Sequence, residues 1–288
     1  MCRLFGMSGG PHRVRATLWL LEAPDSLASQ SRRNPDGTGL GHYDEDSRPH
    51  VDKQPIAAYE DQRFAAEARR VSSRAFVAHV RYASGTPVTL ENTHPFLMDG
   101  RLFAHNGVLQ GLPELESELG DAISFVHGQT DSERYFALIT REIARTGDVV
   151  EGVAAAVGWI ADHLPVFALN FVLITDSDLF ALRYPDTHEL YVLERDADRG
   201  RLQHSSARHR IRVDCDDLAD KRSVVVASEE MDSDPAWRAL DSGELVHVGP
   251  ELGVTSVTAI DRPPLHQLTL ADLEPAAASS QAPLSSRP

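Results

Sequence analysis

Segments typical of β-strands occupy both ends of this chain, and segments typical of helices lie between them. Apolar runs predict strands at residues 2–8, 38–43, 50–53, 74–81, 101–105, 167–175, 179–184, 189–193, 223–228, 244–249 and 253–260. Helices are expected at 14–31 with a break at Pro24, and at 59–70, 113–119, 131–145 and 148–163. Short turns predict that the three strands between 167 and 193 form an antiparallel meander. This order predicts an α+β protein with antiparallel sheets.

The composition narrows the possible functions. The 288 residues carry a net charge of −15, which argues against binding nucleic acid or an anionic membrane surface. No apolar run approaches the roughly 20 residues of a membrane helix, and no signal peptide is visible. Two cysteines in such a chain indicate a reducing compartment, so a cytoplasmic protein is expected. One domain is expected over 2–265, and the tail over 266–288, rich in Ala, Ser and Pro from Asp272, is expected to be disordered.

One of the two cysteines, Cys2, directly follows Met1. Once Met1 is removed, a thiol and a free α-amine would sit on one residue, which gives a nucleophile its own base. Their reference pKa values of about 8.5 and 8 allow both groups to exchange protons near neutral pH. The alternative is that Cys2 only opens a buried strand, because a free cysteine is often a small buried hydrophobe.

Three later motifs have both a functional and a structural interpretation. Arg81 leaves a buried-type strand, where its guanidinium could hold a carboxylate through two hydrogen bonds or form a structural ion pair. Asn106-Gly107 follows a strand and could form an oxyanion hole or an ordinary tight turn. Thr130 and Glu133 fit a helix capping box, which leaves Asp131 free to face a pocket and bind an ammonium group.

Other candidate sites are weaker. The spacing of His79, His94 and His105 fits no zinc pattern, so no metal site is expected. The chain has no Gly-x-Ser-x-Gly elbow, which disfavours a serine hydrolase of that type.

The motifs Met1-Cys2-Arg3, His79-Val80-Arg81-Tyr82, His105-Asn106-Gly107 and Thr130-Asp131-Ser132-Glu133 occur in a fixed order. Because it carries these motifs in this order, the chain closely resembles the class II glutamine amidotransferases over roughly residues 2–260. This family is a branch of the N-terminal-nucleophile (Ntn) hydrolases. It looks most like the stand-alone branch that begins Met-Cys-Arg. That branch includes the γ-glutamyl hydrolase of ergothioneine biosynthesis and an amidotransferase-like subunit of yeast glutathione degradation. The stretch Val226-Ala227-Ser228-Glu229 is similar to their late segment.

The resemblance implies a four-layer αββα sandwich of two antiparallel sheets. It also implies roles for residues: Cys2 as nucleophile with its α-amine as base, and Asn106 and Gly107 as the oxyanion hole. Arg81 would then bind the substrate α-carboxylate and Asp131 its α-ammonium, and His94 would lie on a pocket-side loop. Many family members begin Cys-Gly, whereas Arg3 follows Cys2 here.

The expected reaction is cleavage of the γ-amide of glutamine, or of another γ-glutamyl compound, through a γ-glutamyl thioester on Cys2. No metal or organic cofactor is expected. Two alternatives stay open: a hydrolase specific for a larger γ-glutamyl conjugate, and a non-catalytic regulatory subunit. No synthetase-type domain is recognised after residue 260, so an acceptor of released ammonia would be a separate synthetase or acceptor subunit.

Overall fold

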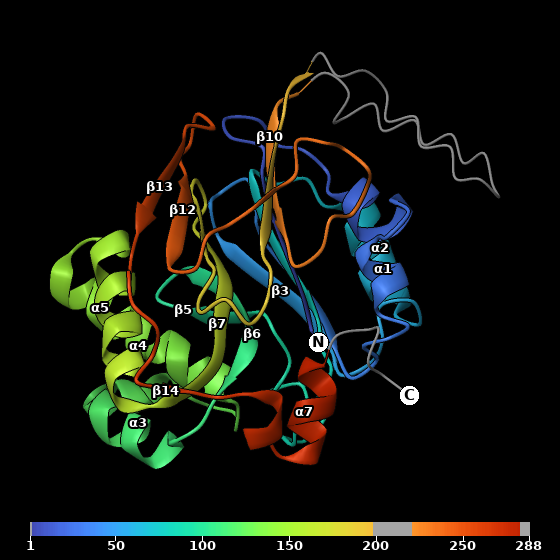
Figure 1. The fold of residues 1–288 in the computed structure, drawn as a ribbon. Helices are drawn as coiled ribbons and strands as arrows, with labels where there is room; N and C mark the ends of the chain where they lie inside the picture. The colour runs from blue at the N-terminus through green and yellow to red at the C-terminus, as the bar shows by residue number, and fades with distance from the viewer. Residues whose placement is uncertain (1, 198–220, 283–288) are drawn as a thin grey trace.

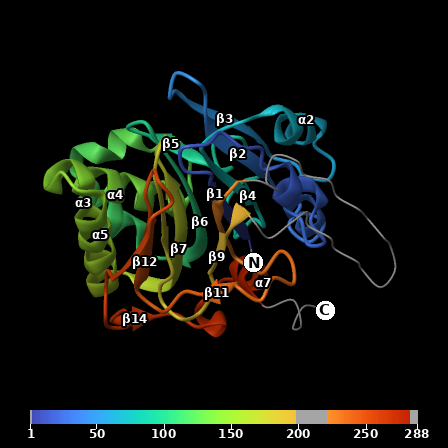
Figure 2. The ribbon, with the colours of Figure 1, turned by 90° about the horizontal axis from the view of Figure 1, so that it is seen from above.

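Two seven-stranded sheets face each other at the centre of the protein. The computed structural model describes residues 2–197 and 221–282. The first sheet has the order β11-β9-β10-β1-β4-β2-β3. Its strands are β1 (Arg3–Ser8), β2 (Thr38–Tyr43), β3 (Pro49–Gln54), β4 (Ala75–Val80), β9 (Tyr191–Arg195), β10 (Ser223–Ala227) and β11 (Arg238–Ala239). All of its pairings are antiparallel, and β1 lies in the middle between β10 and β4; Figure 2 shows β1 beside β4.

The second sheet has the order β13-β12-β8-β7-β6-β5, and β14 pairs with β7 beside this path. Its strands are β5 (Phe96–Met98), β6 (Arg101–Leu109), β7 (Pro165–Ile174), β8 (Leu179–Leu182), β12 (Glu244–Val248), β13 (Val254–Thr258) and β14 (His266–Gln267). The pairings are antiparallel except for the two-residue parallel contact of β14 with β7.

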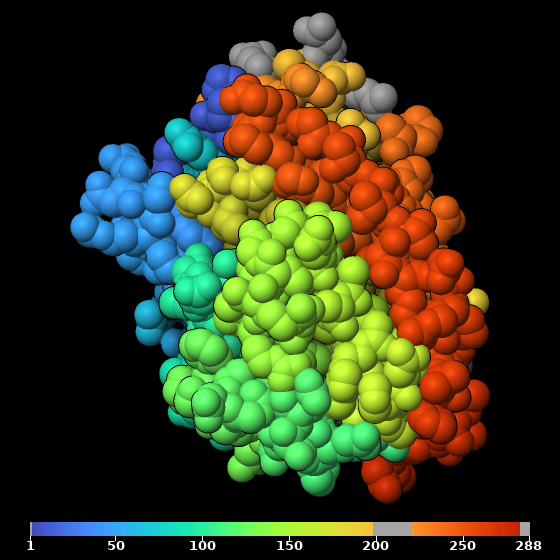
Figure 3. Space-filling model, turned by 90° about the vertical axis from the view of Figure 1, so that its left-hand side faces the viewer, coloured from blue at the N-terminus to red at the C-terminus, as the bar shows by residue number. Residues whose placement is uncertain are grey.

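Helices cover the outer face of each sheet. Over the first sheet lie η1 (Leu18–Glu22, a π-helix), α1 (Leu27–Gln30) and α2 (Gln62–Arg70). Over the second lie α3 (Leu112–Leu119), η2 (Gly120–Phe125, a 3-10 helix), α4 (Asp131–Thr146) and α5 (Val149–His163). Two C-terminal helices, η4 (Leu270–Asp272, a 3-10 helix) and α7 (Pro275–Gln281), are not part of these layers, and α7 lies next to the N-terminal end of the chain (Figure 1). Figure 2 shows the two groups of helices on opposite outer sides with the sheets between them, and Figure 3 shows the face formed by α3, α4 and α5. The four-layer αββα arrangement expected from the resemblance is confirmed.

The apolar core follows these layers. Trp19 and Phe64 pack against the outer face of the first sheet, and Phe136 and Ile160 pack against that of the second. A third cluster, which includes Leu4, fills the space between the sheets. The nucleophile candidate Cys2 therefore precedes a strand that is packed on both faces.

Local signals explain where the helices next to the site begin and end. The Thr130 hydroxyl accepts a hydrogen bond from the Glu133 N–H at 3.2 Å and caps the start of α4. Gly147 ends α4 with a φ of 76°, which a glycine adopts without strain. Asp148 then caps α5, so α4 and α5 form a tight helical hairpin. Of the predicted capping box, the Thr130 half is confirmed, whereas the Glu133 carboxylate accepts the Gly128 N–H at 2.6 Å instead of that of Thr130.

The predicted meander is wrong in its third strand. β7 and β8 pair as expected, but β9 lies in the other sheet beside β10, and β12 takes the remaining edge of β8. The Asn170 side chain directs this crossing: its oxygen accepts the Tyr184 N–H at 2.9 Å and its nitrogen donates to the His188 carbonyl at 3.1 Å. These bonds fix the chain where it leaves the second sheet.

Two further predictions need correction. Residues 14–31 contain only η1 and α1, because Val14 forms a β-bridge with Ser73 instead of entering a helix. The tail expected to be disordered from residue 266 is ordered as far as residue 282, where β14, η4 and α7 are formed. Its order comes from packing, since Leu273 and Ala277 contact Phe167 in a small apolar cluster. Within residues 2–197 and 221–282, no helix is both long and apolar enough to cross a membrane.

Candidate active site

Cys2 lies immediately before β1, with its sulfur against the backbone of Tyr82. The Tyr82 N–H donates to the sulfur at 3.2 Å, and the sulfur lies 3.4 Å from the Tyr82 carbonyl oxygen. The side chain is buried, and burial raises the pKa of the Cys2 thiol. The Tyr82 N–H and the charges of Arg81 and Arg3 oppose this rise. The thiol is therefore neutral at rest and needs a base before it can attack.

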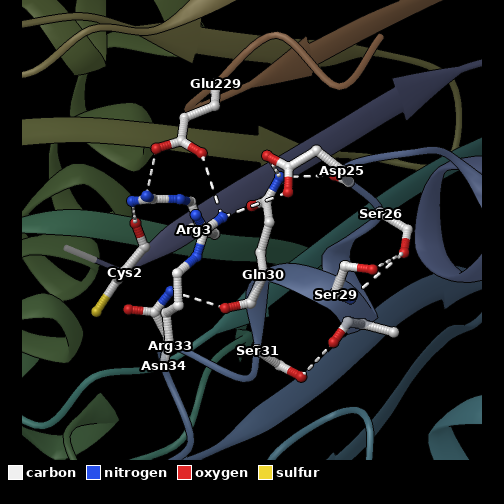
Figure 4. A network of polar contacts seen from close by, with 11 residues as sticks. Cys2, Arg3, Asp25, Ser26, Ser29, Gln30, Ser31, Arg33, Asn34 and Glu229 are labelled. Carbon is white, nitrogen blue, oxygen red and sulfur yellow. Dashed lines mark hydrogen bonds and ion pairs between the residues drawn. The ribbon is translucent and has the colours of Figure 1, made fainter. Parts of the chain in front are cut away.

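Arg3 fixes the backbone of Cys2. Its guanidinium donates to the Cys2 carbonyl at 3.2 Å and forms an ion pair with Glu229 (Figure 4). Because Arg3 is only 1% exposed, it requires such a partner. Arg33 also approaches Glu229, at 3.9 Å. Figure 4 shows the Cys2 sulfur pointing away from this network, so the network positions the residue and leaves the thiol free.

This network accounts for two sequence features together. The departure from Cys-Gly places Arg3 beside Cys2, and the late motif supplies its partner Glu229. The neighbouring Ser228 hydroxyl accepts the Leu4 N–H at 2.9 Å, and the Ser228 N–H donates to the Leu4 carbonyl at 3.2 Å. The end of β10 thus holds the start of β1 at several points.

Arg81 follows β4 and is 4% exposed. Its guanidinium donates to the Pro87 carbonyl at 3.1 Å and to the Thr86 hydroxyl at 2.6 Å. No carboxylate among the described residues forms an ion pair with it, which contradicts the alternative of a structural ion pair. Burial lowers its pKa, while Asp36 and Asp131 raise it. A buried guanidinium bound only to neutral acceptors can still bind a carboxylate.

Asp131 begins α4 and faces the same region. Its carboxylate accepts the Leu109 N–H at 3.0 Å and the Ser132 N–H at 2.8 Å. A carboxylate has about four acceptor positions, so capacity for a ligand ammonium remains.

His105 lies behind Asp131 and is fully buried. Its Nδ1 is 2.9 Å from the Ser132 hydroxyl and its Nε2 is 3.1 Å from the Ala168 carbonyl oxygen. Because a carbonyl only accepts, Nε2 carries the proton and Nδ1 accepts from Ser132. Burial lowers the pKa of His105, although Asp131 opposes this effect. The neutral imidazole thereby fixes Ser132 next to the Asp131 carboxylate.

The pair Asn106-Gly107 is not a turn. Both residues lie within β6, where Asn106 is opposite Asn170 and Gly107 is opposite Leu169. A Cβ at Gly107 would lie 1.8 Å from the Ala168 carbonyl oxygen, so only glycine fits there. The Asn106 side chain is buried, and neither its oxygen nor its nitrogen has a hydrogen-bond partner among the described residues. An unpaired buried amide costs free energy, which points to a ligand that completes it.

His94 and His79 form a buried ring pair beside Arg81, with centroids 4.2 Å apart. None of their ring nitrogens has a hydrogen-bond partner in the described part of the chain. Burial, with further contributions that include the charge of Arg81, lowers the pKa of His79 to about 3 and that of His94 well below its usual value. Both imidazoles are therefore neutral. Within the described ranges, no group of three His, Cys, Asp or Glu residues could hold a metal ion.

One small pocket joins these elements. It encloses about 20 Å³, room for about one water. The candidates that line it are Cys2, Arg81, His94, Gly107 and Asp131. Asn106 lies between two residues of the lining, His105 and Gly107. The pocket therefore brings together the positions that the sequence singled out.

The sequence analysis missed other lining residues. Ser132 and Tyr82 lie inside quoted motifs, but only the structure shows their contacts with His105 and Cys2. Gln281 reaches the same pocket from α7. Its surroundings in sequence are rich in Ala, Ser and Pro, and this composition gave no signal of a site.

Comparison with known proteins decides the family. The sequence profile of the class II glutamine amidotransferases matches residues 1–268. The chain belongs to this family. It is therefore an enzyme of the amidotransferase and amidohydrolase type, which acts on carbon–nitrogen amide bonds.

Individual relatives agree with membership of the class II amidotransferase family. The chain is 30% identical over 281 residues to the gamma-glutamyl-hercynylcysteine sulfoxide hydrolase of Mycobacterium tuberculosis, covering 91% of this chain and 98% of that one. It is 28% identical over 168 residues to the probable glutamine amidotransferase DUG3 of Saccharomyces cerevisiae, covering 51% and 47%.

A solved structure confirms the amidotransferase fold. The glutamine phosphoribosylpyrophosphate amidotransferase from B. subtilis superposes with a TM-score of 0.64 at 20% identity. The match covers 91% of this chain but only 50% of that one, so this chain spans half the length of that protein.

Proposed function

We propose that this protein hydrolyses the γ-amide of glutamine or of another γ-glutamyl compound through a thioester on Cys2. The observation that carries the proposal is the small pocket in which Cys2, Arg81 and Asp131 meet. A nucleophile, a cation and an anion around one small space match the three parts of a γ-glutamyl group: its γ-carbonyl, α-carboxylate and α-ammonium.

Recognition in this proposal depends on charge. Arg81 binds the α-carboxylate with the donors that now hold Thr86 and Pro87. Asp131 binds the α-ammonium. Since the pocket holds little more than one water, the loop that carries Thr86 moves when the substrate enters. His94, which is neutral, lines the part of the pocket that receives the amino-acid end of the substrate.

The chemistry follows from the acid–base state of Cys2. After removal of Met1, the α-amine takes the thiol proton and the sulfur attacks the γ-carbonyl carbon. The Asn106 amide and the Gly107 N–H stabilise the oxyanion, and one such donor is typically worth about 3 kcal/mol. The C–N bond then breaks, and the protonated α-amine gives its proton to the leaving amine. Water hydrolyses the thioester, which releases glutamate and restores the thiol.

A larger γ-glutamyl conjugate is the second candidate substrate. The alignment with the Mycobacterium tuberculosis hydrolase spans almost the whole of both chains, and that protein is named for such a conjugate. The proposal also includes a cytoplasmic location, which the content of only two cysteines supports. If ammonia is transferred rather than released, a separate synthetase or acceptor subunit receives it.

The test is a glutamate-release assay with purified protein. Glutamine, glutathione and a γ-glutamyl anilide are compared, with Cys2→Ala as the inactive control. Quenching the reaction in acid and measuring intact mass should show the γ-glutamyl adduct on the wild-type chain only. The absence of glutamate release from every γ-glutamyl compound would contradict the proposal.

A further inference from the structure

A second and much larger cavity lies next to the small pocket at Cys2. It encloses about 630 Å³, enough for a ligand of small-molecule size. Gln281 lines both spaces, so its side chain forms part of the wall between them. Figures 1 and 2 both show α7, which ends at Gln281, next to the N-terminal end of the chain.

Hydrogen bonds hold the Gln281 side chain in place. Its side-chain oxygen lies 2.7 Å from the His188 Nε2, and its nitrogen donates to the Ser280 hydroxyl at 3.0 Å. His188 is itself fixed, because its carbonyl accepts from Asn170 at 3.1 Å and from Arg183 at 2.9 Å. These bonds hold Gln281 where the two spaces meet.

The larger cavity combines apolar and acidic walls. Phe167, Tyr191 and Leu270 supply apolar surface. Glu189 and Glu229 also line it, but they are paired with Arg183 and Arg3.

Glu230 also lines the larger cavity and has no ion pair among the described residues. Because Glu189 and Glu229 are paired, Glu230 leaves the lining of the cavity with one unbalanced negative charge. Burial raises the pKa of Tyr191, and Glu189 and Glu230 raise it further. The cavity therefore fits an apolar body that carries a positive charge.

We propose that this cavity receives the leaving-group end of the substrate, an amine larger than ammonia with an apolar body and a positive charge, and that Gln281 controls its access to Cys2. The inference rests on the proposed function and deepens it. The γ-glutamyl end occupies the pocket of Arg81 and Asp131, the scissile bond lies at Cys2, and the amine extends past Gln281 toward Glu230.

Two isosteric substrates test the charge preference. γ-L-glutamyl-4-(aminomethyl)anilide carries an ammonium where γ-L-glutamyl-4-ethylanilide carries a methyl group, and L-glutamine has no large leaving group. Wild-type protein should cleave the aminomethyl compound about two- to fivefold better in kcat/KM than the ethyl compound, the effect of one charge pair with the exposed Glu230. Glu230→Gln should remove most of this preference and leave glutamine cleavage unchanged. Glu251→Gln, an exposed carboxylate elsewhere, is the matched control.

Two more variants test whether the larger cavity holds the leaving group. Leu270→Trp fills the cavity and should lower kcat/KM for both anilides at least tenfold, with glutamine changed less than twofold. Leu265→Trp, at a position 68% exposed and outside the cavity lining, is its control. Gln281→Ala opens the wall and should raise kcat/KM for both anilides. Thermal unfolding of each variant shows whether it is folded.

The outcomes separate the two proposals. If glutamine is cleaved but the anilides are not, or if Glu230→Gln and Leu270→Trp change all three substrates equally, the leaving-group cavity is overturned and the proposed function stands. If folded wild-type protein cleaves none of the three, both are overturned.

Discussion

Both backbone polar groups of Tyr82 contact the Cys2 sulfur, the nitrogen at 3.2 Å and the carbonyl oxygen at 3.4 Å. The carbonyl favours the protonated thiol because it can only accept a hydrogen bond, whereas the N–H favours the thiolate. Burial adds to the preference for the thiol. A base close to the sulfur is therefore required, and the α-amine of Cys2 itself is the group that the proposed mechanism uses.

The first prediction concerns this amine. Active protein should begin at Cys2 in an intact-mass measurement, because an amine acylated by Met1 cannot act as a base. Cys2→Ala should abolish glutamate release and leave the thermal unfolding temperature within a few degrees of wild type. Cys215→Ala is the control; this cysteine lies outside the described residues. Full activity of a chain that retains Met1 would contradict the role of the α-amine.

The second prediction concerns Arg81. Arg81→Lys should raise KM for the γ-glutamyl substrate about 10- to 100-fold and change kcat less, since an ammonium cannot reproduce the two-pronged binding of a carboxylate. Steady-state kinetics over a wide substrate range measure the split. Arg101→Lys, whose ion pair with Asp99 lies outside the pocket, should behave as wild type. An unchanged KM for Arg81→Lys would remove this residue from substrate binding.

Sequence patterns singled out residues that the structure brings to one pocket, but they did not predict the pairing of the strands. Arg81 follows a strand and Asp131 begins a helix. Positions of this kind are visible as local patterns in the sequence. Their meeting at Cys2 was expected only from the resemblance to a known family. The crossing of β9 to the other sheet was not predictable, because it depends on Asn170 and Tyr184, which meet only in the folded chain.

The C-terminal segment shows the same limit. Residues 275–281 have the small-residue composition typical of disordered tails, and no internal pattern distinguishes them. Their order comes from Ala277 packing on Phe167 and from Gln281 bonding to His188, 93 positions away in the sequence. Tertiary contacts of this kind are not encoded locally.

The third prediction concerns the ion pair that positions Cys2. Glu229→Gln leaves the buried Arg3 without its carboxylate and should lower the free energy of unfolding by about 2 kcal/mol, less than for a fully buried pair because Glu229 is 30% exposed. Urea denaturation measures the loss. The adjacent Glu230→Gln should stay within about 0.5 kcal/mol of wild type. Equal stabilities of the two variants would contradict a role for Glu229 in holding Arg3.

The fourth prediction concerns acid. His79 has a pKa of about 3 in the folded protein and about 6.5 when unfolded. Between these values the unfolded chain binds a proton that the folded chain does not, so the stability contributed by neutral His79 is full above pH 6.5 and is lost as pH falls toward 3. The slope is about 1.4 kcal/mol per pH unit for each such histidine. Urea denaturation from pH 7.5 to 4.5 should show a smaller slope for His79→Gln. An identical slope would contradict the burial of a neutral imidazole.

The last prediction separates two asparagines that face each other across β6 and β7. Asn170 uses its amide to bind Tyr184 and His188, whereas the amide of Asn106 binds nothing among the described residues. Replacement by leucine, which has a similar volume, should therefore act oppositely on stability. Asn170→Leu leaves the Tyr184 N–H unpaired, although the His188 carbonyl keeps its bond from Arg183, and should cost about 1–3 kcal/mol. Asn106→Leu removes an unpaired buried amide and should be neutral or stabilising.

Activity should show the reverse order for these two residues. Asn106→Leu should lower kcat about 10²–10³-fold with little change in KM, because its amide is proposed to act only on the oxyanion of the transition state. Asn170→Leu, measured at a temperature where it stays folded, should keep most of its kcat. Urea denaturation and steady-state kinetics on both proteins decide the matter. A stable Asn106→Leu protein with wild-type kcat would show that its unpaired amide has no part in catalysis. A large loss of kcat without loss of stability is the pattern of a group kept for function at the expense of the fold.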